Sequence, residues 1–201
     1  LRRAAETAHL ATATVARALE AMDYRLASKE FFDTLEVEAE AAVVQSLALE
    51  QGINFYYPSE GRVRMSFDEV TTAAEIETVV SIFAAAKGKK AKAVKAITES
   101  CVPTALRRQS PYLQEPVFNA YRSESALMRY IKKLELRDIS LANSMISLGS
   151  CTMKLNAAAL MQPLSLAGFQ NMHPFAPADQ AKGYMDLIAG LEQDLATITG
   201  F

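Results

Sequence analysis

The chain has 201 residues and a formal net charge of −2; 50% of its residues are hydrophobic and 22% are charged. This composition is typical of a globular protein of one domain or two small ones, with enough chain to bury a sizeable core. The near-neutral charge argues against nucleic acid and anionic membranes as partners, and no apolar run reaches the roughly 18 residues that a membrane span requires.

The first 22 residues, LRRAAETAHLATATVARALEAM, allow two interpretations. Their Arg, Ala and Thr content occurs in mitochondrial transit peptides, which are poor in acidic residues. However, two glutamates interrupt the segment, and Val15, Leu19 and Met22 recur at helical spacing. We therefore favour an amphipathic helix over a transit peptide.

Two segments alternate apolar and polar residues in the way of half-buried strands. The first is FFDTLEVE (31–38), in which Leu35 and Val37 are the apolar positions. The second is RVRMSF (62–67), with its apolar positions at Val63, Met65 and Phe67. Because NFYY and the four-residue turn PSEG precede it, this second strand is predicted to be half of a hairpin with one buried face.

Two helices are predicted between and after these strands. EAAVVQSLALEQG (40–52) ends on a glycine, a common helix stop, and its apolar face is Val43, Val44 and Leu47. TTAAEIETVVSIFAAA (71–86) has an apolar stripe and a potential capping box from Thr72 to Glu75. The stripe consists of Ile76, Val79, Val80 and Phe83. Up to about residue 100, the chain therefore predicts a small sheet-and-helix sandwich of the α/β (α+β) class, with one partly antiparallel sheet.

The basic run KGKKAKAVK (87–95) carries no interleaved aromatic residue. A patch that binds single-stranded nucleic acid would need aromatic platforms between its positive charges. A solvated helix or loop is therefore the favoured interpretation of this run.

The second half of the chain changes character. Residues 99–125 contain three prolines, scattered aromatic residues and no sustained period, which indicates an extended arm. Such an arm needs another surface to bury its aromatic residues, which include Tyr112, Phe118 and Tyr121. ALMRYIKKLELRD (126–138) then predicts a helix with Leu127, Ile131 and Leu134 on its apolar face.

The last predicted helix begins at Asp179 as N-cap and ends at Gly200. Its apolar side consists of Tyr184, Leu187, Ile188, Leu191, Leu195 and Ile198. The sequence contains neither GxGxxG nor GxxxxGK[ST], so no dinucleotide- or triphosphate-binding loop is predicted.

The cysteines and histidines lack the spacing of a zinc site. The two cysteines are Cys101 and Cys151, and the two histidines are His9 and His173. Because they lie far apart, without CxxC or HxxxH spacing, we predict that no metal is bound. Two separate thiols suit a reducing compartment better than a disulfide framework.

The stretch SLGSCTMKLN (147–156) gathers hydroxyl groups, a thiol and an amine. It is not an SxxK acyl-enzyme motif, because Cys151 occupies the position three residues before Lys154. A nucleophilic Cys151 could pair with His173 and Asn156, but a packed thiol in a tight turn is favoured. Lys154 could form a Schiff base, although a solvated or phosphate-facing lysine is commoner.

The favoured interpretation of this stretch is a turn that positions an anionic ligand. Gly149 allows a sharp turn of the backbone. Short donors that could surround an anion are Ser147, Ser150, Thr152 and Asn156. Downstream, His173 precedes a proline and is more often structural than catalytic; the pair Arg107 and Arg108 could clamp a carboxylate or phosphate, but solvation is favoured.

Several segments together resemble one protein family. They are FFDTLEVE (31–38), QGINFYY (51–57), the run SPYLQEPVFNAYRSESALMRYIKKLELRDISLANSMISLGSCTMKLNAAA (110–159) and HPFAPADQAKGY (173–184). With LGSCTMKLN followed by HPFAP at this spacing, the chain is similar to the glycine decarboxylases, the P-proteins of the glycine cleavage system. The resemblance covers nearly the whole chain.

The resemblance implies a fold and an activity. P-proteins use pyridoxal phosphate (PLP) as an electron sink to decarboxylate glycine, and they pass the aminomethyl group to the lipoyl arm of the H-protein. They consist of two related halves of the PLP-enzyme fold type I and are expected to form homodimers. On this basis residues 1–105 would end the first half, and residues 106–201 would form the crossing arm and opening helices of the second, cofactor-bearing half.

The resemblance also implies an incomplete site. The PLP lysine of the family follows a His before a glycine-rich run, and neither occurs in this sequence. We therefore expect an internal fragment without a catalytic residue of its own, inactive alone. The residues expected to wall the PLP and glycine pocket are Ser150, Cys151, Thr152, Asn156 and His173.

A second hypothesis is an independent, non-enzymatic module for dimerisation or carrier-protein docking. The resemblance to an enzyme favours the first hypothesis. The alanine-rich composition favours a bacterial cytoplasm, with the mitochondrial matrix as the expectation for a eukaryotic source.

Overall fold

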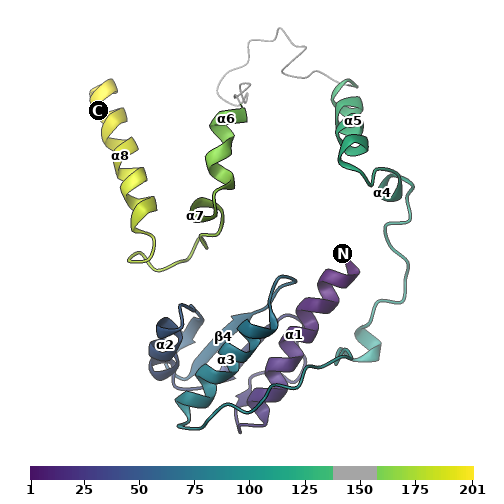
Figure 1. Ribbon diagram of the computed structural model, residues 1–201, viewed down its shortest axis with the longest axis vertical. Helices are drawn as coiled ribbons and strands as arrows, with labels where there is room; N and C mark the ends of the chain where they lie inside the picture. Colours follow the sequence, from purple (N-terminus) through teal and green to yellow (C-terminus); the bar gives the residue numbers. More distant parts are fainter. Residues whose placement is uncertain (138–157) are drawn as a thin grey trace. The chain divides into compact units, whose positions relative to one another are not determined.

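The computed structural model describes residues 1–137 and 158–201 (Figure 1). The chain divides into two compact units, Leu1–Gln109 and Ser110–Phe201. Each unit is described by itself below.

The first unit contains a four-stranded antiparallel sheet in the order β1-β2-β4-β3. Its strands are β1 (Arg25–Leu26), β2 (Thr34–Glu38), β3 (Tyr56–Ser59) and β4 (Arg62–Ser66). At the centre of the sheet, Leu35 pairs with Met65 and Val37 with Val63, so the apolar side chains of β2 and β4 share one face. The two predicted strands and their buried face are confirmed, whereas β1 was not predicted.

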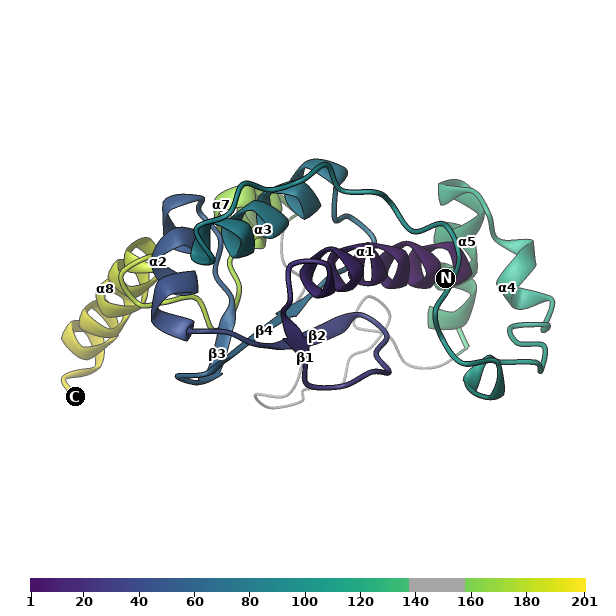
Figure 2. The same ribbon diagram turned by 90° about the horizontal axis from the view of Figure 1, so that it is seen from below.

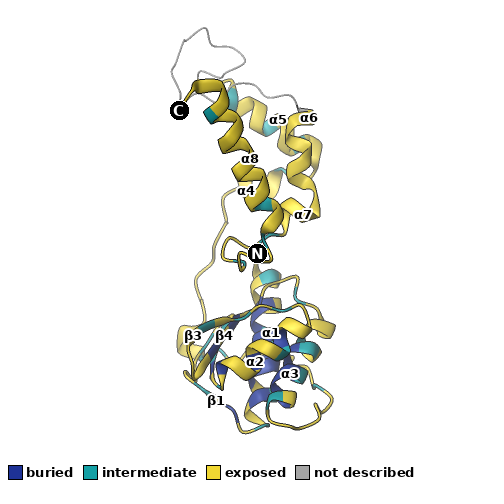
Figure 3. Ribbon diagram, turned by 90° about the vertical axis from the view of Figure 1, so that its left-hand side faces the viewer, coloured by how far each residue is buried: buried dark blue, intermediate teal, exposed yellow. Residues whose placement is uncertain are grey.

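Three helices cover that apolar face of the sheet (Figures 2 and 3). They are α1 (Arg2–Glu20), α2 (Ala41–Glu50) and α3 (Ala73–Ala86). The core between helices and sheet includes Val15, Leu19, Leu35, Val37, Val44, Val63 and Phe83. The small α/β sandwich is therefore confirmed, and the N-terminal segment is the predicted helix, with one face inside the core.

The ends of α2 and α3 follow their sequence signals. Thr72 caps α3 by accepting a hydrogen bond from the backbone of Glu75, and the Glu75 carboxylate accepts one from the backbone of Thr72 in return. This is the predicted capping box. Gly52 follows α2 with φ +69°, a left-handed conformation that glycine adopts without a steric penalty.

Two details of the prediction for residues 40–61 are wrong. Val43 is 36% exposed. The buried face of α2 consists of Ala41, Val44 and Ala48 instead. The two alanines on that face keep its side chains short, which suits a helix that packs against neighbouring elements. The hairpin also turns later than predicted, since β3 extends through Ser59 and only two residues separate it from β4.

The second unit is helical in the part that the structure describes. Its helices are α4 (Val117–Ala120), α5 (Glu124–Glu135), α6 (Ala158–Met161), α7 (Ala167–Gln170) and α8 (Lys182–Thr199). The predicted helix at 126–138 corresponds to α5, which Ser123 caps by accepting from the backbone N–H of Ala126. Short 3₁₀ turns occur at Thr104–Leu106, in the first unit, and at Gln162–Ser165.

The start of the last helix differs from the prediction. α8 begins at Lys182, and its N-cap residue is Ala181 rather than Asp179. The preceding residues form turns instead, with backbone hydrogen bonds from Gln180 to Pro177 and from Ala181 to Ala178. The predicted stop is confirmed, because Gly200 ends α8 with φ +80°.

Burial differs between the two units (Figure 3). The first unit has a core of buried side chains, whereas the described residues of the second unit include no buried one. Within the described ranges, no helix combines the length and apolar character needed to cross a membrane.

Candidate functional site

Most of the predicted site lies outside the described residues. This applies to Ser150, Cys151, Thr152 and Asn156, and to the whole stretch 147–156 around them. Of the five pocket candidates, the structure describes His173, in the connection between α7 and α8.

The backbone around His173 holds its imidazole in one tautomer. The N–H of Phe175 donates to His173 Nδ1 at 3.1 Å, and the N–H of Ala176 donates to the His173 carbonyl at 3.0 Å. A neutral ring that accepts at Nδ1 carries its proton on Nε2. The ring is exposed and lies 5.8 Å from that of Phe175, itself 89% exposed. His173 therefore presents an N–H donor and an aromatic face to whatever adjoins this connection.

A contact between α7 and α8 holds the two ends of this connection together. The Tyr184 hydroxyl donates to the carbonyl of Phe169 at 2.5 Å, and the two rings meet edge to face with centroids 5.7 Å apart. Sequence analysis placed Tyr184 on the apolar stripe of the last helix but missed Phe169. The aromatic residue in the segment before HPFAP was the available signal.

The predicted arginine pair does not present a free clamp at Arg107. Its guanidinium donates from Nε to the carbonyl of Val102 and from Nη2 to the carbonyl of Ser100, both at 2.8 Å. Arg107 thereby closes a turn around Cys101, which lies between these two carbonyls in the sequence.

In the structure His9 and Cys101 are in contact, although they lie 92 positions apart in the sequence. His9 on α1 is 2% exposed, and its Nε2 accepts from the backbone N–H of Cys101 at 3.1 Å. The Cys101 thiol lies 3.3 Å from the same nitrogen. On the other side of the ring, Nδ1 donates to the carbonyl of Phe32 at 2.9 Å. This set of bonds requires the neutral Nδ1–H tautomer.

His9 therefore links α1 to two other segments of the first unit. Its ring stacks on Phe32, with centroids 5.4 Å apart. Four residues before Cys101, the N–H of Ile97 donates to the Thr14 hydroxyl on α1 at 3.0 Å. Two side chains of α1, those of Thr14 and His9, thus accept hydrogen bonds from the backbone N–H groups of the 97–101 segment. Among the residues that the structure describes, no group of three or more His, Cys, Asp or Glu could hold a metal ion.

The open face of the sheet carries an ion-pair network. Glu36 accepts hydrogen bonds from Arg62 and Arg64, and Arg64 also lies over the ring of Tyr56 at 5.5 Å. The bonds from Arg64, followed by those from Arg62, hold the pKa of the Glu36 carboxyl below its usual range. Because the arginines are already paired with Glu36, this face offers no unpaired cation cluster for an anionic ligand.

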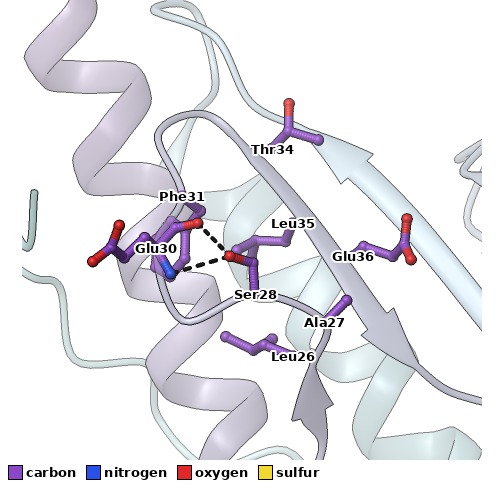
Figure 4. A pocket seen from close by; sticks show the side chains of 8 residues that line it. All are labelled: Leu26, Ala27, Ser28, Glu30, Phe31, Thr34, Leu35 and Glu36. Atoms are coloured by element: carbon purple, nitrogen blue, oxygen red, sulfur yellow. Dashed lines mark hydrogen bonds between the residues drawn. The ribbon is translucent and has the colours of Figure 1, made fainter.

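A small pocket of about 240 Å³ lies at the connection between β1 and β2 (Figure 4). It is lined by Leu26, Ala27, Ser28, Glu30, Phe31, Thr34, Leu35 and Glu36. The Ser28 hydroxyl donates to the carbonyl of Glu30 and accepts from its N–H, so these polar groups satisfy one another. No predicted site residue lines this pocket.

Comparison with known proteins shows what the chain is similar to. Residues 1–83 match the family model described as the glycine cleavage system P-protein. Over its whole length the chain is also similar to proteins named glycine dehydrogenase (decarboxylating). It is 46% identical to that of Flavobacterium johnsoniae over 202 residues, covering 100% of this chain and 21% of the relative.

Relatives from other bacteria give the same result. Identity is 45% to the glycine dehydrogenase (decarboxylating) of Thermosynechococcus vestitus, covering 100% of this chain and 21% of the relative. It is 44% to that of Bacteroides fragilis, with 100% and 22% covered. The resemblance predicted from the motifs is therefore confirmed. The chain spans about a fifth of the length of these relatives.

Proposed function

We propose that this chain is a segment of a PLP-dependent glycine decarboxylase. The observation that carries the proposal is the 46% identity over the entire chain to a protein named for that activity. The complete protein would release CO2 from glycine and transfer the remaining aminomethyl group to the lipoyl arm of the H-protein. Its other expected properties are a homodimeric state and a bacterial cytoplasmic location.

The two units are proposed to belong to different halves of the complete protein. Residues 1–105 would form the α/β subdomain at the end of the first half. Residues 106–201 would form the crossing arm and the first helices of the cofactor-bearing half. The self-contained core of the first unit and the exposure of the described helices of the second support this proposed division.

The proposed pocket wall consists of Ser150, Cys151, Thr152, Asn156 and His173. The described member fits a site for an anionic aromatic cofactor, because His173 combines a proton on Nε2 with an exposed ring face. An imidazole of this kind can donate to an oxygen of the cofactor or substrate and can stack on an aromatic ring. When bound, PLP supplies the electron sink for the decarboxylation.

The chain is proposed to be inactive alone, because it contains no His-Lys pair before a glycine-rich run. The alternative, a non-enzymatic module for dimerisation or carrier-protein docking, is not favoured. A module of that kind would not be expected to share its entire sequence with one segment of an enzyme.

A chimera tests the proposal. The aligned 202-residue segment of the F. johnsoniae protein is replaced by this chain, and glycine-dependent CO2 release is measured with PLP and lipoylated H-protein. We expect the rate to stay within about tenfold of that of the unmodified enzyme. A folded chimera without glycine-dependent CO2 release would contradict the proposal.

Two substitutions in the chimera test the pocket wall. His173→Ala and Thr152→Ala are expected to lower kcat/KM for glycine by tenfold or more, a loss of about 1.4 kcal/mol in transition-state stabilisation for each factor of ten. Gln193→Ala on the polar side of α8 is the matched control and should leave the kinetics unchanged. Unchanged kinetics in both pocket variants would remove these residues from the site.

A further inference from the structure

Residues 87–101, which we call the strap, follow α3 and run beside α1 in the first unit without forming a helix or a strand (Figure 2). At the start of the strap, the Lys87 ammonium donates to the carbonyls of Met22 and Asp23, just after α1, at 2.8 and 2.7 Å. At its end, the backbone of Cys101 bonds to a side chain of α1. Side-chain hydrogen bonds, rather than a strand ladder, therefore fasten the strap at both ends.

Two hydrogen bonds hold the last part of the strap, residues 97–101, on α1. The N–H of Ile97 donates to the Thr14 hydroxyl at 3.0 Å, and the N–H of Cys101 donates to His9 Nε2 at 3.1 Å. The two acceptors respond differently to pH. A threonine hydroxyl keeps its proton, whereas a neutral imidazole can take up a further proton on the nitrogen that accepts.

Proton uptake by His9 acts on one side of its ring. Nδ1 already donates to the carbonyl of Phe32 at 2.9 Å, so the second proton has to bind to Nε2. An N–H at Nε2 would point at the N–H of Cys101, and two donors do not form a hydrogen bond. The bond to Phe32 would survive, because a charged donor makes it stronger. The imidazolium is thus compatible with the contact to the 29–33 loop and incompatible with the backbone bond to the strap.

The surroundings of His9 provide little compensation for a positive charge. The Cys101 sulfur lies 3.3 Å from Nε2, and sulfur is a weak acceptor. The ring is 2% exposed, whereas the charged residues of α1, of the 29–33 loop and of the strap are all exposed to water. These charged residues are Arg2, Arg3, Glu6, Arg17, Glu20, Lys29, Glu30, Asp33, Lys87, Lys89, Lys90, Lys92, Lys95 and Glu99. Because an unpaired buried charge is costly, the protonated ring gains stability when the strap leaves and water enters.

We propose that His9 is a pH-dependent latch for the strap. While the ring is neutral, Nε2 accepts from Cys101 and residues 97–101 stay on α1. When Nε2 takes up a proton, this bond breaks and residues 97–101 leave the helix, while the 29–33 loop stays in place. Imidazole is the side chain whose charge ordinarily changes between about pH 5 and 8, so the latch opens as the pH falls.

The latch controls the connection that leads to the second unit. Residues 97–101 continue through the 3₁₀ turn Thr104–Leu106 to Ser110, where the second unit begins. Opening moves the last hydrogen-bonded anchor beside α1 from Cys101 back towards Lys89, which bonds to Asp23. The tether between the units thereby becomes longer. All contacts of the latch lie within the first unit, so the proposal stands or falls independently of the proposed function.

Amide hydrogen exchange of the 201-residue chain, followed by NMR, tests the latch. Protection factors, which correct for the intrinsic effect of pH on exchange, are measured from about pH 8 down to about pH 5, while the ¹⁵N signals of the His9 ring report its protonation. We expect the protection of the Cys101 amide to fall by about tenfold or more as Nε2 takes up its proton. The amide of Phe67, which donates to the carbonyl of Asp33, should keep its protection.

Two results of this titration would overturn the proposal. One is a constant protection of Cys101 while Nε2 becomes protonated, since the sulfur would then have accommodated the proton with the strap in place. The other is a ring that stays neutral throughout the titration.

Substitution of each histidine assigns the effect. His9→Gln keeps a group that can accept from Cys101 but does not titrate, so the protection of Cys101 should no longer depend on pH. His173→Gln removes the other imidazole of the chain and should leave that dependence unchanged. A loss of protection that persists in His9→Gln would assign it to another group and refute the latch. If His9→Gln does not fold, the unsubstituted chain still decides, because ring protonation and loss of protection have to share one midpoint.

Thr14→Val provides a comparison that does not depend on pH. It removes the other hydrogen bond of the 97–101 segment and should lower the protection of Ile97 to the same extent at every pH. Cys101 should keep its pH dependence in this variant, and its loss there would contradict a latch at His9. None of these readouts uses glycine or PLP, so a chimera without CO2 release would refute the proposed function and leave the latch untouched.

Discussion

At the scale of single residues, His9 makes the most consequential contacts in the first unit. It is almost fully buried, and each of its ring nitrogens bonds to the backbone of a different segment. Buried polar groups of this kind stabilise the fold only while every partner is present, because an unsatisfied backbone group costs about 1–3 kcal/mol. His9 is therefore a structural residue that holds the 29–33 loop and the 97–101 segment on α1.

His9→Ala is expected to lower the free energy of unfolding by about 3 kcal/mol, since it removes a packed ring and both hydrogen bonds. Cys101→Ala is the matched variant. It should cost less than about 1 kcal/mol, because the thiol is exposed and the backbone N–H still donates to His9. Urea unfolding followed by circular dichroism measures both values. Equal losses would show that the thiol, rather than the backbone bond, carries the interaction.

Glu36 is the residue through which the sheet should respond to acid. Hydrogen bonds from Arg64 and then Arg62 lower the pKa of its carboxyl from the ordinary 4.5 in the folded state. A depressed folded pKa stabilises the protein at pH values above the unfolded pKa, and this stabilisation is lost as the pH falls through the folded pKa. Glu36→Gln should therefore weaken the dependence of stability on pH below 4.5. Urea midpoints at pH 7 and at steps below 4.5 test this, and a slope equal to that of the unsubstituted chain would refute it.

At the scale of elements, alanine substitutions at two glycines separate the cost of backbone strain from the cost of steric packing. Gly52, after α2, has φ +69°, whereas Gly61, in the β3–β4 turn, has no positive φ. An added Cβ would meet no atom within 4 Å at either position. Gly52→Ala is thus expected to cost about 1 kcal/mol through backbone conformation alone, and Gly61→Ala to be near neutral. Thermal unfolding compares them; a harmless Gly52→Ala would show that α2 can end without a left-handed residue.

The elements predicted from sequence are those whose pattern matches their burial over several residues. Alternation in β2 and β4, and the stripe and capping box of α3, depend on neighbours along the chain and were predicted correctly. β1 has two residues, too few for a period to appear. The cap at Asp179 was wrong because local turns compete for that segment.

The functional residues, like the structural elements, were predictable from the sequence only where a local pattern encodes them. The contact of His9 with Cys101 joins residues 92 positions apart, and no local pattern encodes a pairing at that distance. The candidates in 147–156 came from a polar turn and a family resemblance, and they lie outside the described residues. Their assignment to a pocket stays a prediction, whereas the resemblance itself is confirmed by the whole-length identity.

At the scale of the whole molecule, the two units differ in how far they account for their own stability. The first unit buries its apolar residues within a sheet-and-helix core, while the described residues of the second bury none. A unit without buried apolar surface has little to offset its chain entropy. The described helices of the second unit are therefore expected to depend on contacts with residues outside the described ranges, and the pocket proposed for 150–173 would be completed only where those contacts are made.

This dependence predicts how the isolated chain behaves with PLP. Titration with PLP, followed by borohydride reduction and peptide mapping, should yield no lysine modified at one equivalent, because the chain has no His-Lys pair before a glycine-rich run. The same treatment of the chimera should label one lysine stoichiometrically, in the part contributed by the F. johnsoniae protein. Lys154→Arg is the matched control and should change neither result. A stoichiometric label on Lys154 in the isolated chain would instead mean that SLGSCTMKLN holds the cofactor by itself, since only a lysine with a strongly favoured reactive form reacts selectively among surface lysines.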